Sequence, residues 1–380
     1  MADPLNYVGV EADTATGYTI AARNLVRAVR ELGQDVVWTP NHWKHERNVQ
    51  TAAASPRPCC ACVVHTVPEY YPLWRARHRA AFGRHPPIWG HTVWETDRLP
   101  AQWPALLNDM DGVIVPTEWN KSVFRASGVT TRIEVLPHVS QFEGKVPNEN
   151  PVRLPELADL EEKFVFYAIG SWTERKAPWL ALNAFLSAFT RDDPVVFVLK
   201  TEPDDRTRPP TRHWRNGFRG RHQRSRDALK SILSGTDRAA VIVIDRYLGD
   251  AEIAALHGRG DCYVSLSRGE GWGFGIYEAA WWGKPVIVEA TGAPLEYLPP
   301  EDPYFVDCRM TPVRAAKIET SYTTDQRWAE PDIAHAARLM RAILSDPPAA
   351  RARGKRIGDH IREHFSSATI ARHFLDIVKS

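Results

Sequence analysis

The stretch from Asp261 to Glu289 constrains the fold of this 380-residue chain more than any other. Its first residues, 261–266, form a short apolar run typical of a buried strand. The next segment, 267–275, holds four glycines, a density that no strand or helix interior tolerates well. Helix formers follow over 276–282, and 285–288 is again apolar. The stretch therefore predicts a strand, a glycine-rich loop, a helix and a second strand.

The glycine-rich loop predicts a binding site for a phosphate or diphosphate. Glycines let the backbone approach a ligand closely, and a helix that begins behind them offers free amides and the positive end of its dipole. Glu270 in the loop and Glu278 in the helix flank this position, and a carboxylate can accept hydrogen bonds from two neighbouring hydroxyls of a sugar. An anion site between two such carboxylates suits a sugar nucleotide. The alternative is a tight turn with solvated glutamates. The backbone candidates are Gly271, Gly273, Phe274 and Gly275.

Other candidates follow predicted strands, where open α/β sheets bind their ligands. In the first half, a strand at 5–10 leads through a loop to Gly17 and a helix at 18–32, and a strand at 88–90 delivers a second polar cluster. In the second half, the strand 164–169 leads to two adjacent cations, which can neutralise charge on a leaving diphosphate. A surface position for these cations is the alternative. The strand-end candidates are Gly17, His91, Thr92, Trp94, Glu95, Arg175, Lys176 and Lys200.

Composition excludes some classes of protein. The chain has 48 basic and 46 acidic residues, so it shows no overall charge for binding nucleic acid or membranes. Five cysteines, no signal peptide and no apolar run long enough to cross a bilayer predict a cytoplasmic protein. The basic segment 74–82 leaves peripheral membrane association open, although a solvated helix face is the simpler interpretation. At this length two domains are expected.

Two residue patterns could indicate a metal site, and one arginine-rich insertion could indicate nucleic-acid binding. The cysteines of 58–64 sit in a valine-rich run that favours a buried strand over a zinc site. Asp109 and Asp111 lie away from the glycine-rich loop, so a metal role there is not expected. The segment 206–226 carries eight arginines with Trp214 and Phe218. It can follow a nucleic-acid backbone, close over an anionic acceptor, or be a solvated loop.

These residues carry a resemblance to a known family. The segment EGWGFGIYE (270–278) resembles the E-x7-E signature of retaining glycosyltransferases of the GT-B type, family four. GSWTERKAP (170–178) and WETDRLP (94–100) are similar to further blocks of that family, while PHVSQ (137–141) departs from its usual P-H-G-V-D. The resemblance implies an α/β fold of two Rossmann-like domains facing across a cleft. It implies an acceptor-side domain over 1–145, a nucleotide-sugar domain over 146–365 and a C-terminal helix, 366–380, that crosses back to the first domain.

The resemblance also implies an activity, namely metal-independent transfer of a sugar from a nucleoside diphosphate sugar to a small-molecule, lipid or glycan acceptor, with retention. No cofactor is expected beyond this co-substrate. Three alternatives stay open: a glycosyltransferase acting on nucleic acid, a catalytically idle binding subunit, and a sugar-nucleotide epimerase. The resemblance implies that Arg175, Lys176 and the amides of Gly273, Phe274 and Gly275 bind the diphosphate. It implies that Glu278 binds the ribose and that Glu270 and His91 contact the donor sugar. It also implies that Gly17, Lys200 and Gly271 take part in donor binding, and that Thr92, Trp94 and Glu95 lie on the acceptor side.

Overall fold

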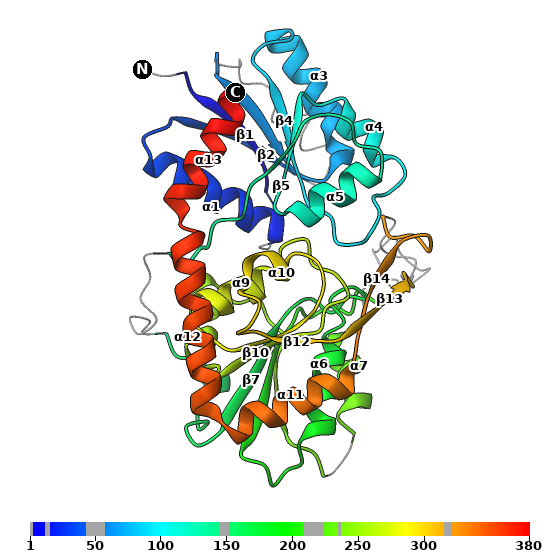
Figure 1. Cartoon of the computed structure of the whole chain (residues 1–380), viewed down its shortest axis with the longest axis vertical. Coiled ribbons are helices and arrows are strands. Elements are labelled where there is room, and N and C mark those ends of the chain that lie inside the picture. The colour runs from blue at the N-terminus through cyan, green and yellow to red at the C-terminus, as the bar shows by residue number, and fades with distance from the viewer. Residues whose placement is uncertain are drawn as a thin grey trace, which may run out of the picture. The chain divides into compact units, whose positions relative to one another are not determined.

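The computed structural model describes residues 3–11, 16–42, 58–143, 152–208, 224–234, 237–314 and 321–380. The chain divides into two compact units (Figure 1). Unit 1 comprises residues 1–143 together with 363–380, and unit 2 comprises residues 144–362. Within the described ranges, no helix combines the length and the apolar character needed to cross a bilayer.

Unit 1 is a parallel six-stranded sheet with strand order β2-β1-β3-β4-β5-β6. The C-terminal helix α13 packs on it, and Phe374 of α13 lies 6.2 Å from Tyr7 of β1 between ring centres. The elements of unit 1 are β1 (Leu5–Val10), α1 (Gly17–Glu31), β2 (Val36–Asn41), β3 (Ala61–His65), η2 (Pro68–Tyr70), α3 (Tyr71–Phe82), β4 (Ile88–His91), α4 (Trp103–Asn108), β5 (Gly112–Val115), α5 (Glu118–Ala126), β6 (Ile133–Val135) and α13 (Ser367–Lys379).

Unit 2 is a second parallel six-stranded sheet, with order β12-β11-β10-β7-β8-β9 and a separate two-stranded hairpin. The long helix α12 begins in unit 2 and ends beyond its last residue. The elements are η3 (Pro155–Leu157), β7 (Phe164–Ile169), α6 (Pro178–Ala188), β8 (Val195–Lys200), α7 (Ser225–Ile232), β9 (Ala240–Ile244), α8 (Asp250–Arg259), β10 (Cys262–Ser265), α9 (Phe274–Trp281), β11 (Val286–Glu289), α10 (Pro294–Tyr297), β12 (Tyr304–Val306), β13 (Cys308–Pro312), β14 (Arg327–Pro331), α11 (Ile333–Ser345) and α12 (Pro347–His364).

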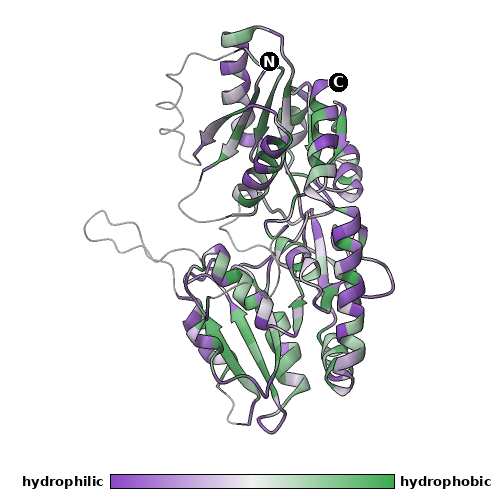
Figure 2. Ribbon diagram, turned by 90° about the vertical axis from the view of Figure 1, so that its left-hand side faces the viewer, coloured by the Kyte–Doolittle hydropathy of each residue, from purple (hydrophilic) through white to green (hydrophobic). Residues whose placement is uncertain are grey.

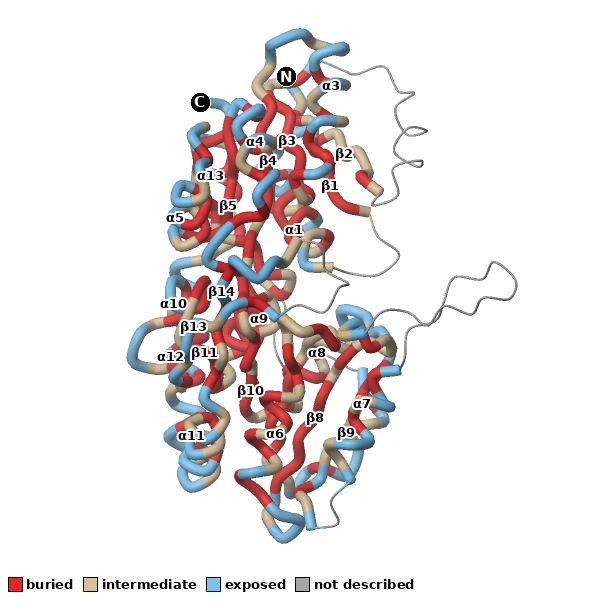
Figure 3. Tube along the Cα trace, turned by 90° about the vertical axis from the view of Figure 1, so that its right-hand side faces the viewer, coloured by how far each residue is buried: buried red, intermediate tan, exposed pale blue. Residues whose placement is uncertain are grey.

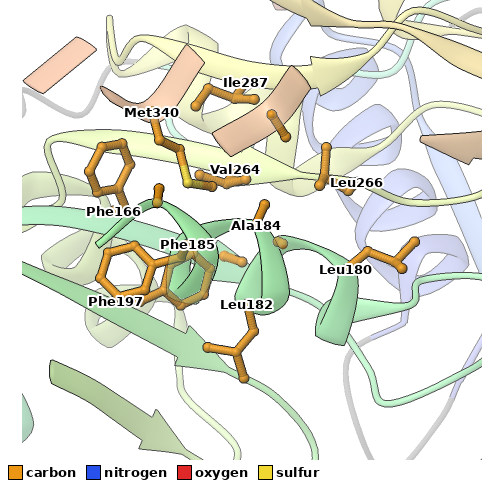
Figure 4. Close-up of a cluster of buried hydrophobic side chains, with 14 of the residues drawn as sticks. Phe166, Leu180, Leu182, Ala184, Phe185, Phe197, Val264, Leu266, Ile287 and Met340 are labelled. Atoms are coloured by element: carbon orange, nitrogen blue, oxygen red, sulfur yellow. The ribbon is translucent and has the colours of Figure 1, made fainter. Parts of the chain in front are cut away.

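The central strands of both sheets are apolar and buried, as parallel sheets covered on two faces require. Figure 2 shows these strands as hydrophobic, and Figure 3 shows them as buried. In unit 2 the helix α6 places Leu180, Ala184 and Phe185 in the same cluster as Phe166 of β7, and Met340 of α11 joins it (Figure 4). This packing fixes the strands whose ends carry the polar candidates.

The predicted elements of the glycine-rich stretch are present, with a shift at the helix. The helix α9 begins at Phe274, two residues before the predicted start, because Gly273 takes a left-handed conformation (φ 85°) and ends the loop there. The strands β12, β13 and β14 had no counterpart in the sequence-based expectation. The hairpin pairs Cys308 with Pro331, and its short, mixed-polarity strands lack the alternation that predicts a hairpin.

Candidate active site

The strand order of unit 2 reverses between β7 and β10, which are hydrogen-bonded neighbours in the sheet. Numbered within the unit, the order is 3-2-1-4-5-6, that of dinucleotide-binding domains. At such a reversal the loops after the two strands run to opposite sides and leave room for a ligand at their carboxyl ends. The loop after β7 carries Arg175 and Lys176, and the loop after β10 carries Glu270.

The three charged candidates of these loops contact one another. The Lys176 ammonium donates to both Glu270 carboxylate oxygens, at 2.6 and 2.8 Å. Arg175 donates to the Gly269 carbonyl at 2.7 Å and lies 3.5 Å from the Glu270 carboxylate. Burial alone would raise the pKa of the Glu270 carboxyl, but the Lys176 and Arg175 charges outweigh it and hold that pKa below its ordinary value. Glu270 is therefore ionised at neutral pH.

The two loops are also tied by backbone contacts. The Arg268 amide donates to the Arg175 carbonyl at 2.8 Å, and the Ser267 hydroxyl donates to the same carbonyl at 3.2 Å. The Arg268 guanidinium donates to Glu174 at 3.0 Å and to Glu330 of the hairpin strand β14 at 2.9 Å. These contacts hold Arg175 and Glu270 in register although they lie 95 residues apart in the chain.

The glycine-rich loop lines a small pocket with a volume of about 30 Å³, room for about one water molecule. Its walls include Gly170 and Lys176 from one loop, Glu270 and Gly273 from the other, and Gly275 from the first turn of α9. Gly271 is buried, and Phe274, the first residue of α9, is half-buried. Gly273 and Gly275, at the N-terminal end of α9, and the Lys176 ammonium thus lie around one pocket, an arrangement that favours an anion.

Gly275 has no room for a side chain. A Cβ there would lie 3.0 Å from Cζ of Tyr263 and would overlap its hydroxyl, which donates to the Ile169 carbonyl at 3.1 Å. We expect Gly275→Ala to destabilise unit 2 by about 1–3 kcal/mol, because Tyr263 must move, and to disrupt the pocket. Gly170→Ala is the matched control, since its Cβ would meet nothing closer than 4.0 Å. Thermal unfolding that shows equal stability for both variants would contradict this packing.

Glu278 lies in α9 and is 4 % exposed. One of its carboxylate oxygens is 3.8 Å from Nε2 of His257, whose Nδ1 pairs with the Tyr167 hydroxyl at 2.9 Å. Burial, assisted by the Lys284 charge, lowers the pKa of His257 to about 3. His257 is thus neutral at pH 7, so it does not neutralise the Glu278 carboxyl by an ion pair.

Lys200 is the last residue of β8. Its ammonium lies 5.8 Å from the ring centre of Tyr247, which is half exposed. Burial lowers the pKa of Lys200, with the neighbouring Arg246 charge acting in the same direction and Glu202 opposing it. The residue stands at the carboxyl edge of the same sheet as Lys176, one strand away from β7.

His91 ends β4 of unit 1 and is 1 % exposed. Its ring stacks on that of His65 at the end of β3, with ring centres 3.8 Å apart and planes within 8°. The Tyr7 hydroxyl pairs with Nδ1 of His65 at 2.6 Å, and the His138 ring lies 5.9 Å from His91. Neither ring nitrogen of His91 has a hydrogen-bond partner among the described residues. Sequence reasoning singled out His91 but not the stack, which follows from the parallel pairing of His65 with His91.

The other candidates of unit 1 have local partners. The Thr92 hydroxyl pairs with that of Tyr18 at 2.8 Å. The Trp94 indole donates to the Thr96 hydroxyl at 2.7 Å, which gives Trp94 a structural role in its loop. Glu95 is half-buried. Gly17 is the first residue of α1, and a Cβ placed on it would have no neighbouring atom within 4 Å.

The described ends of the arginine-rich insertion are engaged in ion pairs. Arg206 contacts Glu202 at 2.8 Å, and Arg224 and Arg226 both contact Asp245, at 3.4 and 2.8 Å. The rest of the predicted segment, 209–223, lies outside the described residues, Trp214 and Phe218 included.

Neither metal pattern forms a centre in the described part of the chain. The cysteines there are all free thiols, and no group of three or more His, Cys, Asp or Glu side chains is arranged to hold a metal. Asp109 and Asp111 instead form ion pairs with Arg75, at 3.0 and 3.7 Å.

Sequence reasoning missed one acidic residue beside the site. Glu289 ends β11, the strand next to β10, and is 0 % exposed. The Ser265 hydroxyl donates to its carboxyl group at 3.5 Å. A glutamate at the carboxyl end of a buried parallel strand is the signal that identifies this position, because that edge of the sheet faces the ligand.

No protein-family model matches this chain, and no curated protein matches it in sequence. Solved structures do match its fold. The chain is similar to sucrose-phosphate synthase from Thermosynechococcus elongatus, at 17% identity and a TM-score of 0.71, covering 99% of this chain and 98% of that one. It is similar to a UDP-forming trehalose-phosphate synthase from Burkholderia xenovorans, at 12% identity and a TM-score of 0.69, covering 100% and 99%. It is also similar to Anabaena HepE in complex with UDP and glucose, at 11% identity and a TM-score of 0.64, covering 100% of both chains. The two Rossmann-like domains thus have the fold of GT-B glycosyltransferases.

Proposed function

We propose that this chain is a glycosyltransferase that uses a nucleoside diphosphate sugar as donor. It transfers the sugar with retention and without a metal to a small-molecule, lipid or glycan acceptor. Retention and family-four membership rest on the resemblance of EGWGFGIYE to the E-x7-E signature. The structures that share the fold include HepE complexes with UDP and with UDP-glucose, so UDP-sugars are the first donors to test.

One observation carries the proposal. Arg175, Lys176 and Glu270 converge at the strand-order reversal of unit 2, beside Gly273 and Gly275. Two cations and a helix N-terminus at the carboxyl edge of a parallel sheet form a site for a diphosphate. The presence of all three residues argues against a catalytically idle binding subunit.

The chemistry follows from the charges. When the bond between sugar and phosphate breaks, negative charge develops on the leaving diphosphate. Lys176 and Arg175 stabilise that charge more in the transition state than in the ground state, which is what accelerates the reaction. Glu270 pairs with the two cations and thereby holds them in place, and it accepts hydrogen bonds from sugar hydroxyls once the donor is bound. The roles of Gly17, His91, Thr92, Trp94 and Glu95 stay predictions from the resemblance.

The donor assignment is tested at Glu278, which we assign to the ribose hydroxyls. We expect Glu278→Ala to weaken UDP binding by about 10- to 150-fold, since a charged hydrogen bond contributes about 1.5–3 kcal/mol. Titration calorimetry measures this change, and Glu301→Ala removes an exposed carboxylate as control. UDP affinity equal to that of the native protein would refute the ribose role.

A native protein that binds none of the UDP, GDP, ADP and TDP sugars in a thermal-shift panel would refute the function.

The nucleic-acid alternative gains nothing from the described residues. Arg206 pairs with Glu202, and Arg224 and Arg226 share Asp245, so these three arginines leave one positive charge that no acidic residue balances. A polymer-binding groove also spreads basic charge over more surface than a chain with a formal net charge of +2 offers.

A further inference from the structure

In the described part of the chain, no cation pairs with the buried carboxyl group of Glu289. It lies at the carboxyl end of β11 with 0 % exposure, and among the described residues it forms no ion pair. One oxygen is 3.5 Å from the Ser265 hydroxyl, and the other has no hydrogen-bond partner in the described part of the chain. An ionised carboxylate in such surroundings is costly, and a group in this position takes up a proton instead.

The nearby cations are already occupied. Lys176 donates two hydrogen bonds to Glu270, and Arg175 is the second cation of that carboxylate. Burial raises the pKa of the Glu289 carboxyl well above its ordinary value, and the Glu270 charge raises it further, while the residue's own backbone, the Lys176 charge and Ser265 offset only part of this. The pKa values of Glu270 and Glu289 are thus shifted in opposite directions. The titratable groups that act on Glu289 or are acted on by it are Lys176, Tyr263, Glu270, Tyr297 and Cys308.

We infer that Glu289 is a positioning residue that is held as a neutral carboxylic acid and thereby keeps the Arg175–Lys176–Glu270 cluster net positive. With Glu289 neutral, two cations face one carboxylate and a single positive charge remains to attract a diphosphate. With Glu289 ionised, the charge of the cluster and Glu289 taken together would be zero. The effect on diphosphate binding rests on the proposed function, whereas the neutral state of Glu289 does not.

The consequence for pH has a definite sign. An acid whose pKa is raised on folding lowers stability progressively as pH rises above its unfolded value, about 4.3. Glu289→Gln keeps the shape of the side chain without this penalty. The variant should therefore melt at a higher temperature than the native protein at pH 7.5 and at nearly the same temperature at pH 4.5.

Two measurements on the ligand-free protein test the neutral state. Infrared difference spectra between the native protein and Glu289→Gln should contain the carbonyl stretch of a protonated carboxyl group at pH 7.5, and this band should shift in D2O. Glu301→Gln, which changes an exposed carboxylate, should leave that band in place. A missing band, or a melting temperature of Glu289→Gln that does not rise at pH 7.5, overturns the inference.

Binding measurements then test the charge. Glu289→Gln should bind UDP and inorganic pyrophosphate within about twofold of the native protein at pH 7, and should lose less affinity than the native protein as pH is raised. A tenfold loss in Glu289→Gln at pH 7, or identical pH profiles, overturns the inference. If the native protein binds pyrophosphate but no nucleotide, the proposed donor is wrong and the role of Glu289 stands. Native protein that binds neither probe refutes both the donor site and the charge effect.

Discussion

Lys176→Ala should lower kcat by about 10²–10³-fold while raising KM for the donor far less. Lys176 is a fixed cation on the loop after β7, and its charge matters most when the leaving diphosphate gains charge. Loss of one preorganised donor of this kind costs about 3–4 kcal/mol of transition-state stabilisation. Steady-state kinetics measure the effect with the donor that the thermal-shift panel identifies.

Two controls keep this result interpretable. Lys230→Ala removes an exposed ammonium that pairs with Asp227 within α7, and it should leave kcat unchanged. Removing Lys176 also leaves Glu270 with Arg175 alone, so thermal unfolding must show that the variant is folded. A folded Lys176→Ala variant with native kcat, or native activity abolished by EDTA, would show that leaving-group stabilisation works differently.

Mild acid should destabilise unit 1 strongly. His65, His91 and His138 are buried next to one another, and burial lowers the pKa of each. A histidine with a depressed folded pKa is protonated first in the unfolded chain, so stability falls as pH drops below about 6.5. Each group costs about 1.4 kcal/mol per pH unit. Because the unfolded histidines are only partly protonated at pH 6.5, the three together should remove about 5 kcal/mol between pH 6.5 and pH 5.0.

Calorimetric or urea unfolding as a function of pH measures this slope. In His138→Gln the slope assigned to unit 1 should fall by about a third, because burial lowers the pKa of His138 to about 3 in the native chain. His257 is the matched case in unit 2, where burial also lowers the pKa of the histidine to about 3. Stability that is flat between pH 6.5 and pH 5.0 would mean that the three rings are hydrated in solution.

Local sequence signals were sufficient for most of the sheet architecture. The strands Leu5–Val10 and Phe164–Ile169 have the predicted bounds, because buried parallel strands are continuous apolar runs with clear ends. The start of α9 was placed late because its position depends on the left-handed backbone of Gly273, which a residue pattern does not reveal. The hairpin β13–β14 was missed for a related reason, since long-range pairing rather than local pattern makes these strands.

The site shows the same division. Arg175, Lys176 and Glu270 could be selected because each follows a recognisable strand, and their contact follows from the pairing of β7 with β10. His65 and Glu289 could not be selected in the same way. The role of His65 depends on its register with His91, and that of Glu289 depends on being buried beside an already paired carboxylate. Register and burial are tertiary properties.

The strand order of unit 2 also dictates when the site can exist during synthesis. Lys176 leaves the ribosome 94 residues before Glu270, the carboxylate that pairs with it. Until β10 has been made, β7 is the open edge of a three-stranded β7-β8-β9 sheet, and its residues FVFYAI form an apolar template for pairing with another chain. A nascent or truncated chain that ends before residue 266 therefore has an aggregation-prone edge and no donor site. A recombinant form of unit 2 should therefore include every residue through α12. It then contains β10, the strand that covers the edge of β7.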